Sequence, residues 1–147
     1  MMYTILKHSH AGLRWIVLLI FIATLLLLFK QAFGNDRKTG KPKTFSLLTM
    51  IGLHIQLLIG LILYFISPKV VFDATSMKDS LLRFYLVEHV SMMVIAIGLV
   101  TYGYVALAKK TELHSAGRKQ FYYYLAAFVL MLFAIPWPFR ELGGTWF

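Results

Sequence analysis

Three histidines in three long apolar stretches are the residues of this sequence best suited to chemistry. His10 lies at the start of the first stretch, His54 near the middle of the second and His89 near the start of the third. A titratable ring in a membrane-length segment is costly unless it contacts protein, water or a bound group. Imidazole is also a common ligand of haem iron and transition metals. We therefore take these histidines as candidate ligands of a cofactor or metal ion.

Three charged residues are further candidates for the site: Arg14 and Arg140 could hold an anionic group, and Glu88 could pair with Arg14. Arg14 follows His10 by one helical turn, so both side chains share a face. Glu88 directly precedes His89, and Arg140 follows the last apolar stretch. An arginine in a membrane needs a partner, and either Glu88 or an anionic group of a cofactor could be the partner of Arg14. Alternatively, Arg14 extends its guanidinium to the outer surface.

Two other interpretations of the histidines remain open. A histidine in a membrane helix can simply hydrogen-bond to a neighbouring helix, which is a structural role. Alternatively, His8 precedes His10 by two residues, and the two would form a copper or other metal site with His89.

The composition predicts a membrane protein. The chain has 147 residues, of which 59% are hydrophobic and 14% charged, and its mean hydropathy is +0.72. We expect one transmembrane domain over 1–147, with lipid as its solvent. The absence of cysteine excludes iron–sulfur clusters and covalent c-type haem. The net charge of +9 does not indicate a nucleic-acid partner, because the basic residues flank apolar runs.

Four helices are predicted, over about 10–30, 44–66, 81–109 and 120–135. Gly34, Pro68 and Pro136 end the first, second and fourth, and Asp79 or Ser80 can cap the third. At about 1.5 Å per residue each helix spans or nearly spans a bilayer core. The fold class is therefore all-α, an integral membrane up-and-down four-helix bundle.

The basic residues predict the orientation of this bundle. The first and third connections contain eight lysines and arginines, which favour the cytoplasm and place both termini on the outer, periplasmic side. No small-residue cleavage site follows the apolar run at 15–29, so we expect this run to stay in the membrane as a helix. The chain also lacks GxSxG, HExxH and phosphate-binding glycine motifs. An electron carrier or a subunit is therefore expected rather than a stand-alone enzyme.

Residue counting predicts which histidines meet. His10 is twenty residues from Lys30, and His89 is twenty residues from Lys109. Twenty helical residues rise about 30 Å, so these imidazoles should lie at equal height on diagonal helices. His54 is eleven residues from Lys43, which places it about 14 Å lower. We expect His10 and His89 to face each other, and His54 to lie apart unless the second helix is shifted.

The chain resembles a family of small bacterial four-helix membrane proteins labelled cytochrome B, which are distantly similar to transmembrane di-haem cytochromes. The similar segments are 8–15 (HSHAGLRW), 54–68 (HIQLLIGLILYFISP), 82–89 (LRFYLVEH) and 135–140 (IPWPFR). The resemblance implies b-type haem ligated by His10, His54 or His89 in a bacterial inner membrane. Di-haem members use four helix ligands, whereas only three histidines lie in the predicted helices here, so one haem is expected.

These observations predict an electron carrier with haem b near the outer face, with Arg14 and Arg140 as candidate partners of the propionates. A quinol or a redox protein would be its electron-transfer partner. The alternatives are an accessory subunit of a larger respiratory membrane complex, and a membrane protein with copper at its outer edge.

Overall fold

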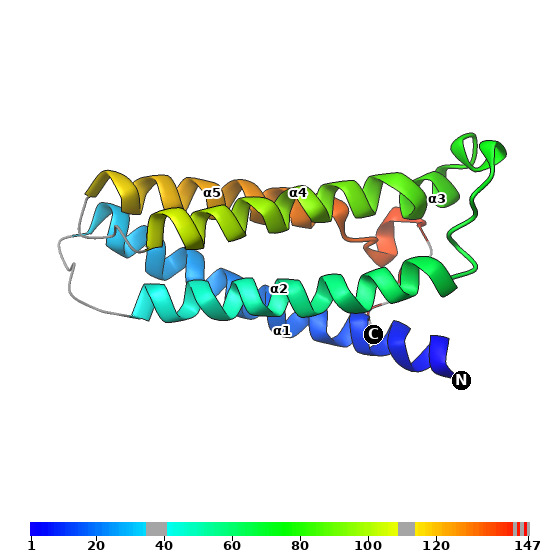
Figure 1. Ribbon diagram of the computed structural model, residues 1–147, viewed down its shortest axis with the longest axis horizontal. Helices are drawn as coiled ribbons and strands as arrows, with labels where there is room; N and C mark the ends of the chain where they lie inside the picture. Colours follow the sequence, from blue (N-terminus) through cyan, green and yellow to red (C-terminus); the bar gives the residue numbers. More distant parts are fainter. Residues whose placement is uncertain (35–40, 109–113, 143, 145, 147) are drawn as a thin grey trace.

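The computed structural model describes residues 1–34, 41–108, 114–142, 144 and 146, and these residues form helices and connections with no strand. Four long helical segments lie side by side and alternate in direction (Figure 1). Two short 3₁₀ turns, at Ala74–Met77 and Pro138–Arg140, lie in the segments that follow α2 and α5. The long segments are α1 (Met2–Phe33), α2 (Lys41–Ile66), the consecutive pieces α3 (Ser80–Arg83), η2 (Phe84–Glu88), α4 (His89–Tyr102) and η3 (Gly103–Leu107), and α5 (His114–Ala134).

The helix boundaries extend beyond several predictions. α1 begins at Met2 instead of near His10, so His10 lies within the helix. α1 ends at Phe33, and Gly34 follows it with extended backbone, where an added Cβ would overlap the Lys30 carbonyl oxygen. α2 ends at Ile66 as predicted, and α5 begins earlier than the predicted residue 120. The predicted end of the third helix, at Lys109, lies outside the described residues.

The third segment contains π-helical turns that the sequence did not indicate. Asp79 caps it, as predicted, by accepting hydrogen bonds from the backbone N–H groups of Leu81 and Leu82. The His89 N–H then bonds to the carbonyl of Phe84, five residues earlier, which is the π-helical pattern.

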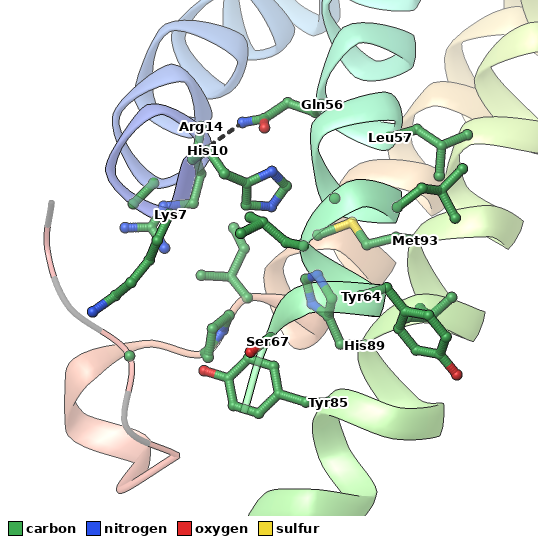
Figure 2. Close-up of a pocket in the computed structure, with 18 of the residues that line it drawn as sticks. Lys7, His10, Arg14, Gln56, Leu57, Tyr64, Ser67, Tyr85, His89 and Met93 are labelled. Atoms are coloured by element: carbon green, nitrogen blue, oxygen red, sulfur yellow. Dashed lines mark hydrogen bonds between the residues drawn. The ribbon is translucent and has the colours of Figure 1, made fainter. Parts of the chain in front are cut away.

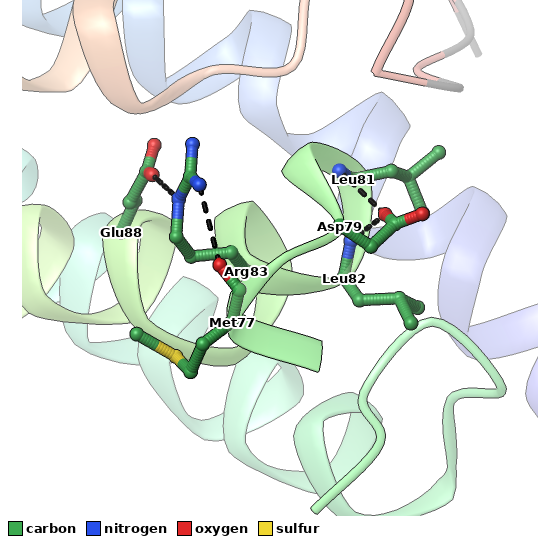
Figure 3. A network of polar contacts seen from close by, with 6 residues as sticks. All are labelled: Met77, Asp79, Leu81, Leu82, Arg83 and Glu88. Carbon is green, nitrogen blue, oxygen red and sulfur yellow. Dashed lines mark hydrogen bonds and ion pairs between the residues drawn. The ribbon is translucent and has the colours of Figure 1, made fainter. Parts of the chain in front are cut away.

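The π turn decides the partner of Glu88. It brings residues five apart onto one face, and Arg83 Nε lies 2.8 Å from Glu88 Oε1 (Figure 3). An ordinary α-helix pairs residues three or four apart instead. The proposed Glu88–Arg14 pair is therefore wrong, because Glu88 pairs with Arg83.

The packing places α1 and α4 on a diagonal. Each of these helices packs against both α2 and α5. The buried side chains between them include Phe21 of α1, Leu53 of α2, Val100 of α4 and Tyr124 of α5. Phe21 packs edge-on against the Tyr124 ring at 5.8 Å. Side chains at matching heights on α1 and α4 therefore face each other across the interior.

A buried polar cluster joins three segments in the half of the molecule opposite the N-terminus. Thr24 and Thr49 share a hydrogen bond of 2.8 Å between their hydroxyl oxygens. Gln120 Nε2 donates to Ser46 Oγ, and the Tyr124 hydroxyl donates to the Ser46 carbonyl, each at 3.1 Å. These bonds satisfy polar groups that apolar surroundings would otherwise leave unpaired.

Three helical segments are long and apolar enough to cross a membrane: Met2–Phe33, Lys41–Ile66 and Ser80–Leu107. Large apolar side chains cover their outward faces, as Leu19, Leu58 and Ile95 illustrate, which is consistent with lipid contact. α5 does not reach the same hydropathy, because residues 114–120 at its start are largely polar. The membrane character of the chain is therefore supported by three segments.

Candidate functional site

A cavity of about 190 Å³ lies among α1, α2 and α4, in the half of the molecule that contains the N-terminus (Figure 2). One ordered water needs only about 10–15 Å³, so this cavity has room for a ligand. Its interior is mainly apolar and includes Leu57, Met93 and Ile97. Its polar lining comes from Tyr3, Lys7, His10, Arg14, Gln56, Tyr64, Ser67, Lys69, Tyr85 and His89.

His10 and His89 project into this cavity from diagonal helices (Figure 2). Their ring centres lie 6.5 Å apart, and the ring planes are inclined by 74°. Two imidazoles that ligate one metal ion from opposite sides, with bonds of about 2.0–2.1 Å, would place their centres about 6 Å apart. The structure thus brings this pair to a separation that suits a shared metal or haem iron.

The hydrogen bond of His89 leaves one ring nitrogen for a ligand. His89 Nδ1 donates to the Ala134 carbonyl at 2.7 Å, since a carbonyl oxygen only accepts. The proton is then on Nδ1, and Nε2 keeps its lone pair. Metal-ligating histidines usually donate their other ring N–H in this way. The same bond also joins α4 to α5, which is the structural role that the sequence left open.

His10 has an unmet hydrogen bond in the interior. Its Nδ1 is buried and has no hydrogen-bond partner among the described residues. Its ring packs against Gly60, where a Cβ would lie 3.3 Å from His10 Cε1. Gln56 Nε2 donates to the His10 backbone carbonyl at 3.0 Å. A ligand bound at the pair would satisfy such a buried polar atom, which makes His10 and His89 the candidate ligands of a metal ion or haem iron.

The structure does not bring the other candidate histidines to this pair. His54 is exposed, and its Nδ1 bonds to the Met50 carbonyl of its own helix at 2.8 Å. His54 lines a separate shallow groove with Val94 and Thr101. His8 is exposed and does not line the cavity. Within the described part of the chain, no cluster of three or more histidines and carboxylates is arranged to hold a metal ion.

Of the two candidate arginines, only Arg14 lines the cavity. Arg14 donates to the Trp146 carbonyl at 3.1 Å, and its guanidinium lies 5.2 Å from the centre of the Trp15 ring. Arg140 is not among the lining residues, and it donates to the carbonyls of Phe133 and Ile135. Arg140 therefore hydrogen-bonds to backbone carbonyls at the C-terminal end of α5.

The sequence reasoning missed a polar mouth of the cavity. Lys69 follows α2 and donates from Nζ to the Tyr85 hydroxyl at 3.4 Å. The Tyr85 hydroxyl in turn donates to the Leu142 carbonyl at 3.0 Å. Helical spacing offered a signal, because Lys7 lies three residues before His10 and Tyr85 lies four before His89. The position of Lys69 depends on an irregular connection and had no such signal.

Comparisons with known proteins add no relative: no protein-family model, curated protein or solved structure matches the chain. The resemblance to the bacterial proteins labelled cytochrome B therefore remains a prediction from the sequence segments.

Proposed function

We propose that this chain is a membrane electron carrier that holds one haem b between His10 and His89. The observation that carries the proposal is the 6.5 Å separation of these two rings across an apolar cavity. A haem with two axial imidazoles supplies one-electron redox chemistry, with a potential that the ligands and their surroundings tune.

The side chains around the pair suit this task. The bond from His89 Nδ1 to Ala134 fixes the orientation of the ring and makes its other nitrogen a better ligand. Gly60 leaves room for the His10 ring, and Gln56 holds the backbone of His10. Leu57 and Met93 keep the interior apolar, which limits the access of water to the iron.

In this proposal the chain is an up-and-down four-helix bundle in a bacterial inner membrane, with α5 as the fourth crossing helix. The end of α1 and the starts of α2 and α5 lie at the opposite end of the molecule from the cavity (Figure 1), and they contain Lys30, Lys41, Lys43, Arg118 and Lys119. This distribution of charge favours the outer side for the haem and both termini. A quinol or a redox protein would then exchange electrons with the haem near this outer face.

The test is a chemical and spectroscopic analysis of the full chain, purified after expression with adequate haem. We expect about one non-covalent haem per chain and a sharp b-type band in the reduced-minus-oxidised spectrum. Preparations that contain no haem under these conditions would exclude the proposal.

Two alternatives have supporting observations. Met93 lines the cavity with the histidines, and a thioether with imidazoles suits copper, so stoichiometric copper without a Soret band would favour that metal. The His89–Ala134 bond suits an accessory subunit in which His89 only joins helices. That role predicts co-purification with a large membrane complex and no cofactor of its own.

A further inference from the structure

The groove that His54 lines lies between α2 and α4 and is open to the surface. Its volume is about 520 Å³, and its lining is mainly apolar. α2 contributes His54 and Leu57, and α4 contributes Val94, Gly98 and Thr101 among others. A Cβ at Gly98 would meet no atom within 4 Å. This part of the groove therefore has free space for a flat ring.

The depth of the groove limits what can occupy it. His54 lies near the middle of α2 (Lys41–Ile66), which is long and apolar enough to cross a membrane. At about 1.5 Å per residue, His54 is roughly 20 Å from either end of this helix. The apolar core of a bilayer is about 30 Å thick, so lipid head groups do not reach this level. An occupant from the membrane needs a mainly apolar body.

The hydrogen bond of His54 decides which polar group can meet its ring. Nδ1 donates to the Met50 carbonyl of its own helix at 2.8 Å, since a carbonyl oxygen only accepts. The neutral ring then keeps a lone pair on Nε2, which makes no hydrogen bond within the described part of the chain. Thr101 uses its hydroxyl proton in a bond to the Ile97 carbonyl at 2.7 Å. Both side chains therefore offer lone pairs, and a ligand that meets them has to donate.

Two side chains line both the groove and the cavity of the histidine pair. These are Leu57 of α2 and Ile97 of α4. A ring bound in the groove would thus be separated by these side chains from a haem between His10 and His89. A redox partner that dissolves in the membrane needs such proximity for electron exchange.

We propose that the groove between α2 and α4 binds a membrane quinol, with a ring hydroxyl that donates a hydrogen bond to His54 Nε2. The apolar tail, flat ring and hydroxyl of a quinol match the lining, the space at Gly98 and the lone pair of His54. The choice of a quinol among lipid-soluble donors rests on the proposed function, because a haem carrier needs a redox partner. The oxidised quinone cannot bond to Nε2 in this way, since its ring oxygens only accept. A second copy of the chain fits less well, because two such His54 rings would oppose lone pair to lone pair.

The test measures binding in the haem-free chain, so it does not depend on haem ligation. The full-length chain is labelled with [15N]histidine, produced without added haem, and reconstituted in zwitterionic liposomes without oxygen, at mildly alkaline pH where imidazole is neutral. Decylubiquinol, decylubiquinone or decanol is added in increasing proportion to the lipid, and solid-state NMR follows the His54 Nε2 signal. We expect a saturable shift with decylubiquinol, at an affinity about tenfold above that of decylubiquinone, because one hydrogen bond is lost with the quinone. Decanol can donate but has no ring, and it should give no saturable shift.

Variants that retain His54 assign the shift to the groove, and His54→Asn identifies the signal by its loss. Gly98→Leu fills the free space and should abolish the saturable shift. Gly12→Leu is the matched control, since a Cβ at Gly12 also meets no atom within 4 Å and Gly12 lines neither hollow. Tyr102→Phe removes another hydroxyl of the groove and should keep the preference for the quinol. Circular dichroism shows whether each variant is folded.

The outcomes separate this inference from the proposed function. Equal affinity for quinol and quinone, or a saturable shift that survives in folded Gly98→Leu, would overturn the site. Loss of the preference in Tyr102→Phe would overturn the role of His54, and a saturable shift with decanol would overturn the choice of a quinol. A His54 signal that responds to the ratio of protein to lipid, and not to quinol, would identify a second copy as the occupant. None of these results alters the b-type spectrum that tests haem ligation.

Discussion

The imidazole rings of His10 and His89 lie 6.5 Å apart, centre to centre, at an angle of 74°. These residues belong to α1 and α4, which lie on a diagonal and each pack against α2 and α5. A group ligated by both rings would therefore join two helices across the interior. The proposed ligand site rests on this separation of the two rings.

The first prediction concerns Gly60, which gives the His10 ring its space. A Cβ at residue 60 would lie 3.3 Å from His10 Cε1, so Gly60→Leu should displace the ring. We expect the variant to keep its helical content but to lose most bound haem, measured by Soret absorbance per chain. Gly98→Leu is the control, because a Cβ at Gly98 would meet no atom within 4 Å. Equal loss in both variants would mean that haem uptake does not depend on the His10 ring position.

The second prediction concerns the unfavourable free energy of placing the charged Lys69 ammonium in the folded chain. Its pKa is lowered in the fold, first by burial and then by Lys7. The unfolded chain therefore binds more protons between the lowered pKa and the ordinary lysine value of about 10.4. The penalty is fully present at neutral pH and disappears as pH rises through this window. Lys69→Met should thus raise the melting temperature of the ligand-free chain at pH 7, with a smaller gain at alkaline pH. A lower melting temperature at pH 7 would contradict this reasoning.

The third prediction separates the polar cluster from the candidate site. The Thr24 hydroxyl shares a hydrogen bond with the Thr49 hydroxyl, and the carbonyl oxygens of Ile20 and Phe45 lie within hydrogen-bond distance as alternative acceptors. Thr24→Val should destabilise the chain by about 1 kcal/mol, the usual range for a hydrogen bond between membrane helices. Unfolding in mixed micelles measures the change. In the Thr24→Val background, Thr49→Val should destabilise the chain less than Thr49→Val alone does, because the two hydroxyls share one bond. Haem content should stay at the wild-type level, since the cluster lies away from the cavity.

Residue counting along helices predicted part of the candidate site. Equal numbers of residues to the basic ends placed His10 and His89 at one height, and the structure brings these two rings together. The same counting separated His54, which lies on an exposed surface outside the cavity. A regular helical rise is a local property, so sequence alone suffices for this reasoning.

The remaining contacts depend on irregular or distant backbone. The pair of Arg83 and Glu88 arises from a π turn, which hydropathy and capping patterns do not indicate. Arg14 bonds to the carbonyl of Trp146, which is 132 residues away. Lys69 meets Tyr85 through the connection between α2 and α3. These partners are decided by tertiary structure, and no spacing rule in the sequence predicts them.

The most direct measurement of the central claim is the reduced-minus-oxidised spectrum of three single variants, His10→Ala, His89→Ala and His54→Ala. Each protein is purified with the same haem supply, and the b-type band is normalised to protein. We predict that His10→Ala and His89→Ala each lose the sharp band of a six-coordinate haem, whereas His54→Ala keeps it at wild-type intensity. A band that survives in His10→Ala or His89→Ala, or that disappears in His54→Ala, would contradict the assignment of His10 and His89 as the axial pair.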